Sequence, residues 1–598
     1  MFTAPFVLLD DARENGAPAR LYRAPVRIVR ADTPEAVRPA LEALRAATAE
    51  GLHAAGMMSY EAGMALAPRS IRPDKAAPES AATDHSARAP LLWFGLFDGY
   101  ETIAADAVAR RLPDPAGAWV GTARPQIDRD AYDAQIARVL ALIAAGDIYQ
   151  ANLTFAAIVP YAGDPLALYA GLRGQARAGY GALIDTGTQA ILSLSPELFF
   201  GLEHDRLTCR PMKGTAPRGA TPDADRAAAS ALAADPKQRA ENLMIVDLMR
   251  NDLSQVAHDV AVPDLFSIET YPTVHQMTST VTARLDSARD AVDVIAALFP
   301  CGSITGAPKQ RAMEVIAEVE QGRDRGAYTG AIGCIDANGD AMFNVAIRTL
   351  TIQDDRAVMG LGSGIVADSV ADQEWQECLD KAAFLTAGRR PLDLIETMAF
   401  DPDHGLLRLE RHLARLSASA AALGFAFDRH GTRNELQAAT FRLRGPRRIR
   451  LLVAASGAVA IQVGPMPVSP ARIEVAVMPL PVPTADIRLR HKTSDRAFYE
   501  DARRQAGTFE VVFEDPQGFL TEGSFTSIFV PRADGMLVTP PAGALLPGIL
   551  RAELIANGTA VEGPLTRADL RHGFYMGNAV RGLIPAIVAV AKSADRGV

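Results

Sequence analysis

Apolar positions recur at two spacings along the chain, and each spacing predicts a different kind of element. The stretch RDAYDAQIARVLALIAAGDIYQANL, from Arg129, has apolar residues at helical spacing up to Gly146 and then becomes strand-like. The segment GAIGCIDANGDAMFNVAIRTLTI alternates apolar and polar residues around Asn338-Gly339, which predicts a hairpin. Helical and strand patterns are intermixed, so we expect an α+β fold for the first part of the chain.

The pattern starts afresh near Gly388-Arg-Arg-Pro391, which predicts a domain boundary. A helix that contains Lys381 precedes this point, and a strand, LDLIETMAF, and an amphipathic helix, LLRLERHLARLSASAAALG, follow it. We therefore predict one domain over residues 1–390 and a second over residues 391–598. The stretch 70–90 is rich in Ala, Pro and Ser and is interpreted as a mobile surface loop.

Composition narrows the class of protein. The 598 residues are 48% hydrophobic and 22% charged, as in an ordinary globular protein, and the net charge of -9 argues against nucleic-acid binding. The start, MFTAPFVLLDDAREN, gains aspartates where a signal peptide needs an apolar core, and LIPAIVAVA is too short to span a bilayer. Four scattered cysteines form no CxxC pair. We expect a cytoplasmic protein without a zinc site, a disulfide framework or a membrane partner.

One lysine, Lys213, lies among turn-forming residues in RPMKGTAPRG. Upstream, SLSPELFFGLEHDRLTCRPMKGT contains two apolar runs joined by a polar turn. A hairpin of this kind returns the chain to its start and brings Glu197 close to Lys213. A carboxylate beside an amine, near Thr215, suits a small acidic substrate, and a surface ion pair is the alternative.

Carboxylates also interrupt two helical segments. RAENLMIVDLMRNDLSQVA is apolar over most of its circumference but contains Glu241, and DQEWQECLDKAAFL places Glu374, Glu377 and Lys381 on one helical face. Carboxylates from two helices could hold Mg²⁺ while a substrate carboxylate completes the oxygen shell. A solvated helix face is the alternative for the second segment.

Eight motifs in order resemble the chorismate-utilising enzymes, which include the synthase subunits for anthranilate, aminodeoxychorismate and isochorismate. They are DIYQANLTF, SPELFF, RPMKGT, AENLMIVDLMRNDL, YPTVHQM, FPCGSITGAPK, FNVAIRTL and GSGIVADS. The resemblance is strong from Asp147 to Leu385 and weak over residues 1–130. It implies a chorismate-binding fold like that of anthranilate synthase component I.

The lysine discriminates between branches of this family, because aminodeoxychorismate synthases carry lysine where the other two enzymes carry alanine. The resemblance implies that Lys213 attacks carbon 2 of chorismate, that the carbon 4 hydroxyl leaves, and that ammonia then adds at carbon 4. It assigns acid/base catalysis to Glu197, a place near the reacting ring to His275 and a substrate carboxylate to Arg348. The other implied residues are Thr215, Thr305, Lys309, Gly362 and Gly364 for the substrate, and Glu241, Glu377 and Glu374 for Mg²⁺.

The ammonia source is implied to be a second protein. No GxCxG motif of a glutamine amidotransferase occurs in the sequence. The resemblance therefore implies a separate glutamine amidotransferase subunit that delivers ammonia, or the use of free ammonia. In some relatives the N-terminal region binds tryptophan. The segment MMSYEAGMAL lies in that part of the chain, and whether the pocket persists stays open.

A second group of chemically active residues follows residue 391. Lys492 lies in LRHKTSDRAFYEDARRQ between a strand-like run and a helix, and Glu522 opens a strand in LTEGSFTSIFV. LLPGILRAELI begins a helix whose free N–H groups suit a phosphate, and MGNAVRGLIP offers similar backbone donors. A lysine, a glutamate and a phosphate cup together predict a pyridoxal phosphate site.

The motifs HKTSDRAF, TEGSFTSIF and LPGILR resemble those of the class IV aminotransferases, a fold-type IV family that includes branched-chain aminotransferases and aminodeoxychorismate lyase. The resemblance implies a pyridoxal-phosphate-dependent α/β domain in which Lys492 binds the cofactor covalently and Glu522 holds its pyridine nitrogen. The residues that it assigns to the phosphate are Arg415, Gly548, Ile549, Asn578 and Ala579.

Fold and cofactor do not decide the second reaction, because a lyase and a transaminase share this apparatus. The neighbouring half favours a lyase that eliminates pyruvate from 4-amino-4-deoxychorismate, and hence a bifunctional enzyme of p-aminobenzoate and folate synthesis. Three alternatives stay open: an anthranilate synthase subunit fused to an aminotransferase, a synthase fused to an amino-acid transaminase, and a C-terminal module that only recruits the glutaminase. A homodimer through the second domain is compatible with the sequence, which defines neither the oligomeric state nor transfer of the intermediate.

Overall fold

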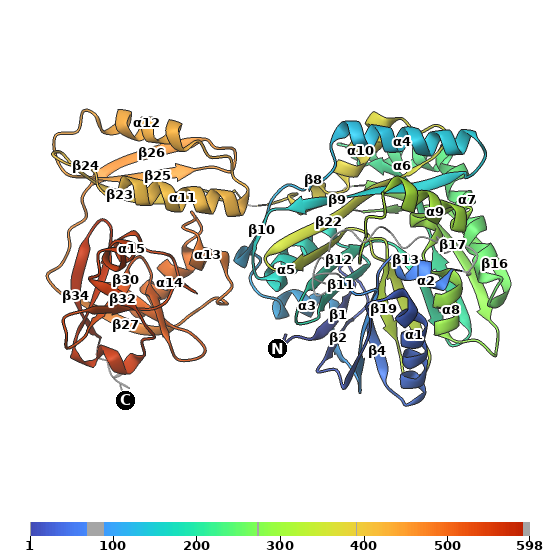
Figure 1. The fold of residues 1–598 in the computed structure, drawn as a ribbon, viewed down its shortest axis with the longest axis horizontal. Helices are drawn as coiled ribbons and strands as arrows, with labels where there is room; N and C mark the ends of the chain where they lie inside the picture. The colour runs from blue at the N-terminus through green and yellow to red at the C-terminus, as the bar shows by residue number, and fades with distance from the viewer. Residues whose placement is uncertain (1, 68–88, 272–273, 390, 544, 590–598) are drawn as a thin grey trace. The chain divides into compact units, whose positions relative to one another are not determined.

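A computed structural model describes residues 2–67, 89–271, 274–389, 391–543 and 545–589 (Figure 1). Most of the stretch 70–90, interpreted above as a loop, lies outside these residues. The chain packs as two compact units. The first consists of Met1–Leu112, Thr122–Val159 and Tyr169–Ala387, and the second of Pro113–Gly121, Pro160–Leu168 and Gly388–Val598.

The first unit is built on two large antiparallel sheets, each with ten strands among the described residues. In spatial order the first sheet contains β18 (Gly306–Ala307), β9 (Gln150–Val159), β22 (Arg356–Ile365), β21 (Thr349–Gln353), β12 (Ala190–Ser195), β11 (Tyr180–Asp185), β1 (Phe6–Asp10), β2 (Ala19–Arg23) and β6 (Glu101–Ile103), with β8 (Arg124–Pro125) beside β9. The second contains β15 (Met212–Pro217), β17 (Val274–Leu285), β14 (Arg206–Arg210), β13 (Leu198–Glu203), β20 (Ala341–Val345), β19 (Ala331–Ile335), β4 (His53–Met58), β5 (Leu92–Phe97) and β3 (Arg27–Ala31), with β16 (Ala257–Thr270) beside β17.

Apolar side chains from both sheets form a common core. Val7 and Tyr22 of the first sheet pack in one buried cluster with Met57 and Trp93 of the second. The outer face of the second sheet is covered by helices, among them α1, α7 and α8 (Figure 1). The helices of this part of the chain are α1 (Pro34–Ala49), α2 (Ala62–Leu66), α3 (Ala105–Arg111), α4 (Arg129–Ala144), α5 (Pro165–Ala176), α6 (Pro222–Ala234), α7 (Pro236–Leu253), α8 (Ala291–Leu298), α9 (Lys309–Val319) and α10 (Ala371–Asp380).

The predicted local elements are confirmed. The helical pattern from Arg129 forms α4, and the strand-like segment after Gly146 forms β9. The hairpin around Asn338-Gly339 joins β19 to β20, and Gly339 has φ +91°, a conformation that glycine adopts without strain. The α+β expectation is also confirmed, because long antiparallel sheets and separate helices make up this unit.

The second unit contains a small sheet and a larger mixed sheet. The small one consists of β24 (Gly405–Leu406), β23 (Leu394–Asp401), β25 (Arg447–Val453) and β26 (Val459–Pro465). The larger one runs in the order β29 (Leu520–Gly523), β28 (Glu510–Glu514), β27 (Ile473–Pro479), β34 (Gly582–Val588), β33 (Phe574–Asn578), β30 (Ser527–Pro531), β31 (Leu537–Thr539) and β32 (Ala560–Glu562). The helices are α11 (Leu409–Leu423), α12 (Arg429–Thr440), α13 (Ile487–Arg490), α14 (Ala497–Ala506) and α15 (Ile549–Ala556).

Two short segments from the earlier part of the chain join this unit. They contribute β7 (Ala118–Val120) and β10 (Tyr161–Gly163), which pair with each other. The assignment of one function to residues 1–390 and another to residues 391–598 stays a prediction. By packing, Pro113–Gly121 and Pro160–Leu168 belong to the second unit although they precede residue 390. Among the described residues, none of the helices combines the length and the apolar character that crossing a bilayer requires.

Candidate functional site

Glu197 and Lys213 are joined by the predicted hairpin, which the structure forms from β13 and β14. Glu197 is only 3% exposed, and Ser303 Oγ donates a hydrogen bond to its Oε1 at 2.6 Å. Burial raises the pKa of Glu197 to about 7, although the Ser303 bond and the charge of Lys213 oppose that rise. A carboxyl group that titrates near neutrality can both donate and accept a proton.

The Lys213 amine is also desolvated. Burial lowers the pKa of Lys213, while the carboxylates of Glu241, Glu197 and Glu377 act in the opposite direction. The amine lies against β22, because a Cβ placed on Gly364 would be 3.0 Å from Lys213 Nζ. Any larger residue at position 364 would therefore press on the amine.

The side-chain amide of Gln150 is directed at the same glycine, because Gln150 Nε2 is also 3.0 Å from a Cβ placed on Gly364. Gln150 is fully buried, and neither its amide nitrogen nor its carbonyl oxygen has a hydrogen-bond partner among the described residues. An unpartnered buried amide is costly, so a polar ligand beside Lys213 would satisfy it. The sequence interpretation missed this residue, although it lies in the motif DIYQANLTF.

Two of the carboxylates predicted to bind Mg²⁺, Glu241 on α7 and Glu377 on α10, lie close enough for their charges to act on Lys213. Burial raises the pKa of Glu241 on α7, and the charges of Glu374 and Glu377 on α10 raise it further. Glu377 pairs with Lys381 at 2.7 Å. In the described part of the chain, no three Asp, Glu, His or Cys side chains form a ready set of metal ligands. The donors nevertheless fit Mg²⁺ chemically, because all three are carboxylates, the ligands that this ion prefers.

The guanidinium of Arg348 is buried without an acidic partner among the described residues. It follows β20 with φ +51°, and burial lowers the pKa of its guanidinium. Within the described residues it forms no ion pair, whereas many arginines of this chain do. A desolvated guanidinium needs a carboxylate or an equivalent partner, so Arg348 is suited to bind an acidic substrate.

Other predicted residues are engaged by the protein itself. The two ring nitrogens of His275 lie 3.1 Å from Thr270 Oγ1 and 2.9 Å from Asp225 Oδ1. Lys309 Nζ donates to the carbonyl of Leu298 at 2.7 Å and pairs with Asp252 at 2.5 Å. These contacts hold both side chains in place without linking them to Lys213.

The two predicted threonines also bond within the protein. Thr305 Oγ1 donates to the Cys301 carbonyl at 2.8 Å, and Thr215 Oγ1 donates to Gln276 Oε1 at 3.1 Å. On β22, the carbonyl of Gly362 accepts from Lys381 Nζ at 2.8 Å. The last contact connects the glycine strand with the helix that carries Glu374 and Glu377.

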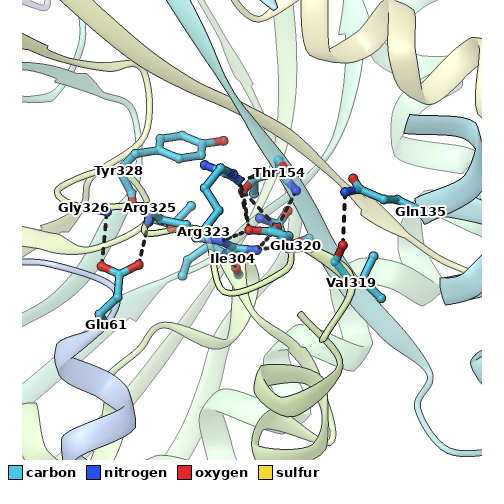
Figure 2. A network of polar contacts seen from close by, with 12 residues as sticks. Glu61, Gln135, Thr154, Ile304, Val319, Glu320, Arg323, Arg325, Gly326 and Tyr328 are labelled. Atoms are coloured by element: carbon cyan, nitrogen blue, oxygen red, sulfur yellow. Dashed lines mark hydrogen bonds and ion pairs between the residues drawn. The ribbon is translucent and has the colours of Figure 1, made fainter. Parts of the chain in front are cut away.

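A buried ionic network braces β9, the strand that carries Gln150 (Figure 2). Glu320 accepts from Thr154 N at 2.8 Å and pairs with Arg325 at 2.6 Å. Arg325 also donates to the Asn152 carbonyl at 2.7 Å. Glu61, in the segment MMSYEAGMAL, accepts from the Arg325 amide at 2.6 Å, and burial raises its pKa to about 7. This part of the N-terminal region thus supports the strand beside Lys213.

The second group of predicted residues lines one cavity of about 600 Å³. Lys492 and Glu522 lie in its wall. The predicted phosphate ligands line it as well: Arg415, Gly548, Ile549, Asn578 and Ala579. Gly548 precedes α15, and a Cβ at this position would lie 2.5 Å from Ser527 Oγ, so the close approach requires glycine.

The amine of Lys492 is prepared by its surroundings. Burial lowers its pKa to about 7, and the positive charges of Arg415, Arg496 and Arg450 lower it further against the opposing charge of Glu396. Lys492 Nζ donates to Thr397 Oγ1 at 3.3 Å. A lysine with a pKa of about 7 has a substantial neutral fraction near pH 7 and can act as a nucleophile or a base.

Glu522 and Arg415 are each fixed by hydrogen bonds. Tyr499 OH donates to Glu522 Oε1 at 2.6 Å, and burial raises the pKa of this carboxyl to about 7. Arg415 grips Glu396 with Nε and Nη2, both at 2.7 Å, and donates from Nη1 to the Pro547 carbonyl at 2.9 Å. Three of its five N–H donors are used, which leaves two for a phosphate.

The cavity wall also contains donors that the sequence interpretation missed. Arg450 Nε and Arg496 Nη1 are buried donors without a hydrogen-bond partner among the described residues. Together with the backbone at Gly548, directly before α15, these donors make the cavity suitable for an anionic cofactor and substrate. The arginines that line it besides Arg415 are Arg448, Arg450, Arg496, Arg503 and Arg581. Arg448 and Arg450 come from one strand, β25, but only the fold brings them together with Arg496, Arg503 and Arg581.

Two known families match successive parts of the chain, although the packing assigns Pro113–Gly121 and Pro160–Leu168, which lie within the first match, to the second unit. A family described as chorismate binding enzyme matches residues 5–387. A family described as amino-transferase class IV matches residues 393–587. Anthranilate synthase component I from Streptococcus pneumoniae superposes with a TM-score of 0.52 and 26% identity over 64% of this chain and 93% of that one.

Curated relatives resemble less than half of the chain. Aminodeoxychorismate synthase component 1 of Klebsiella aerogenes is 45% identical over 260 residues, which are 43% of this chain and 57% of that protein. The protein of that name from Escherichia coli (strain K12) is 44% identical over 255 residues, 42% of this chain and 56% of the relative. Anthranilate synthase component 1 1 of Haloarcula marismortui is 41% identical over 259 residues, 43% and 53% of the two chains. The chain thus spans little more than half the length of these relatives.

Proposed function

Because the chain belongs to the family of chorismate binding enzymes and carries a class IV aminotransferase domain after it, we propose that it performs two successive reactions. The first converts chorismate and ammonia to 4-amino-4-deoxychorismate, and the second releases pyruvate and leaves p-aminobenzoate. The observation that supports the first reaction is a desolvated amine, Lys213, beside the protonatable carboxyl of Glu197. Relatives named aminodeoxychorismate synthase component 1 support the same choice.

In the first reaction Lys213 acts as a transient nucleophile. Its neutral amine attacks carbon 2 of the ring, the double bond shifts, and the bond from carbon 4 to the hydroxyl breaks. Glu197 gives this hydroxyl a proton so that it leaves as water. Ammonia then adds at carbon 4 while the bond from carbon 2 to Lys213 breaks, and one proton is released. Arg348 holds a substrate carboxylate, and Gln150 offers a polar contact at the same site.

Mg²⁺ would be held by Glu241, Glu377 and Glu374 and would neutralise charge at the substrate carboxylate. Burial, and to a smaller extent the charges of Glu374 and Glu377, raise the pKa of Glu241, so a bound cation would favour its ionised form. Ammonia would come from a separate glutamine amidotransferase subunit, which the words "component 1" in the relatives' names support.

The second reaction belongs to the arginine-lined cavity. Pyridoxal phosphate bound there would supply an electron sink. Glu522 would hold its pyridine nitrogen, Arg415 with the start of α15 would bind its phosphate, and Lys492 would take the proton from carbon 4 of 4-amino-4-deoxychorismate. Arg448, Arg450 and their neighbours suit a substrate with two carboxylates, which supports 4-amino-4-deoxychorismate over a simple amino acid.

An amino-acid transaminase is the second candidate for this domain, because the matched family is described as amino-transferase class IV. The purified chain would be incubated with chorismate, ammonia and Mg²⁺, with and without pyridoxal phosphate, and the products identified by mass spectrometry. We expect 4-amino-4-deoxychorismate without the cofactor, and p-aminobenzoate with pyruvate when it is added. Anthranilate as the product would overturn the first assignment. A pyruvate yield that depends on an added keto acid would favour the transaminase.

A further inference from the structure

Two segments of the first half of the chain are built into the core of the second unit. Trp119, in Pro113–Gly121, is only 5% exposed and packs in the apolar cluster that contains Leu394, Leu416 and Phe425. Its indole N–H donates to the Leu423 carbonyl at 2.8 Å, at the end of α11. An indole that is both buried and hydrogen-bonded is a structural part of this core.

The same segment contacts the turn that leads to Lys492. Asp114 pairs with Arg488 on α13 at 3.0 Å. Arg488 also pairs with Asp486 at 2.6 Å and with Asp495 at 3.3 Å, so it joins the residues on both sides of Lys492. Asp486 and Arg488 are almost fully buried, so this central pair loses little strength to solvent, whereas Asp114 is 56% exposed and its pair with Arg488 is weaker.

The second segment approaches the same turn. Gly163 has φ +105°, and a Cβ there would lie 2.3 Å from the Gly117 carbonyl and 2.7 Å from Ile487 Cγ2. The backbone of Pro160–Leu168 therefore lies directly against Pro113–Gly121 and α13. Beyond α13, the Lys492 carbonyl accepts from Ile395 N at 2.8 Å, which ties the turn to β23.

We propose that Pro113–Gly121 and Pro160–Leu168 are a docked part of the pyridoxal phosphate site, with Trp119 and Asp114 as positioning residues for the turn that carries Lys492. Trp119 holds the end of α11, the helix that carries His412 and Arg415, and Asp114 holds Arg488. This inference rests on the proposed role of Lys492 and adds that the second site needs chain from the first half.

The strand beside Lys213 continues directly into one of the two docked segments. β9 pairs with β22 beside Lys213, with Asn152 opposite Gly364, and it ends at Val159. The next residue, Pro160, already belongs to the second unit. One strand therefore leads from the first site directly into a segment that supports the second, so a cut near residue 388 does not separate two complete catalytic units.

The docking is tested by fluorescence in the full chain. The double variant Trp93→Phe, Trp375→Phe leaves Trp119 as the only tryptophan, because the sequence contains three. We expect blue-shifted emission, strong protection from acrylamide and further quenching when pyridoxal phosphate is added. Emission typical of an indole in water would overturn the inference whatever the chemistry of Lys492. The same variant with Lys492→Ala should keep the buried emission and lose the visible band of bound cofactor.

Positioning is tested by cofactor binding. Trp119→Ala should weaken binding of pyridoxal phosphate about tenfold or more and shift the pH dependence of its visible absorption, because the cavity left by an indole lets α11 and the turn move. Trp119→Phe should restore most of the affinity, and Asp114→Asn should weaken binding less than Trp119→Ala.

The matched control is Asp106→Asn, which removes an exposed carboxylate paired with Arg110 on α3 and should leave binding unchanged. Unchanged affinity and an unchanged pH profile in Trp119→Ala would overturn the positioning role. If the otherwise unaltered chain forms no cofactor band while Trp119 is buried, the proposed function fails and the docking remains.

Discussion

Lys213 and Lys492 are both desolvated amines with a lowered pKa, yet the charges around them have opposite signs. Around Lys213 the carboxylates of Glu241, Glu197 and Glu377 outnumber one cation, Lys381, and partly restore the basicity that burial removes. Around Lys492 three arginines add to burial and oppose one carboxylate, Glu396, and the pKa is about 7. The pKa of a lysine is thus lowered in two different surroundings. The acidic residues around Lys213 suit Mg²⁺, and the basic residues around Lys492 suit phosphate and carboxylates.

A glutamate with a pKa raised to about 7 accompanies each lysine, Glu197 in the first unit and Glu522 in the second. Burial is the main cause in both cases. Ser303 donates to Glu197, whereas Tyr499 and the Leu546 amide donate to Glu522. The difference lies in the proposed use, since Glu197 faces a leaving hydroxyl and Glu522 a pyridine nitrogen.

The largest effect should come from removing either amine. Lys213→Ala should reduce formation of 4-amino-4-deoxychorismate by about a thousandfold or more, because no other described group replaces the nucleophile. The variant should still release pyruvate from added 4-amino-4-deoxychorismate, and Lys492→Ala should show the converse pattern. Both activities would be measured by product analysis, and an equal loss of both in either variant would contradict two separate sites.

Glu197→Gln should reduce the first reaction by about 10²- to 10⁴-fold, because glutamine can keep the Ser303 bond but cannot give a proton. The rate of formation of 4-amino-4-deoxychorismate with saturating ammonia would be followed against pH. In the original chain this rate should fall as the pH rises above about 7, where the Glu197 acid is lost. Ser303→Ala is the matched control. A rate in Glu197→Gln close to that of the control would exclude Glu197 as the acid.

The same glutamates should lower stability at alkaline pH. A carboxyl whose pKa is raised on folding contributes stability below its unfolded value, near 4.5, and loses that contribution as the pH rises through about 7. Glu522→Gln should therefore stabilise the cofactor-free protein at pH 8 by about 2–3 kcal/mol and have little effect at pH 4. Urea unfolding at the two pH values measures this, and an equal effect at both would contradict the assignment.

The smallest effect concerns the basic residues around Lys492. Arg450→Gln removes a positive charge near Lys492, so the pKa of the amine should rise by about one unit towards its ordinary value. The pH dependence of covalent pyridoxal phosphate binding reports this pKa. Arg442→Gln, on an arginine outside the cavity wall, serves as the control. A pKa that falls or stays constant would mean that the arginines do not tune this amine.

Much of the architecture could be predicted from local patterns. The helix from Arg129, the hairpin at Asn338-Gly339 and the hairpin that joins Glu197 to Lys213 are set by apolar spacing and turn residues over short stretches. The two-family organisation was predicted from ordered motifs and is confirmed by the family matches.

Other features of the sites could not be predicted from the sequence. Lys309 was predicted for the substrate, but its ammonium pairs with Asp252, which lies far away in the sequence. Nothing in the motif DIYQANLTF distinguishes Gln150, and only the fold shows that its side-chain amide is buried without a hydrogen-bond partner among the described residues. Apart from Arg448 and Arg450, which share β25, the arginines of the second cavity come from different parts of the chain, and their common wall appears only after folding.

The sequence by itself determined which side chains can do chemistry and which local elements carry them, because helix, strand and turn preferences depend on near neighbours. Only the tertiary structure decided which of these groups are buried away from water and which charged residues surround them. It also decided that Trp119 belongs to the second unit. Desolvation and Coulomb interactions depend on atoms brought together from distant parts of the chain, so they have no local signature.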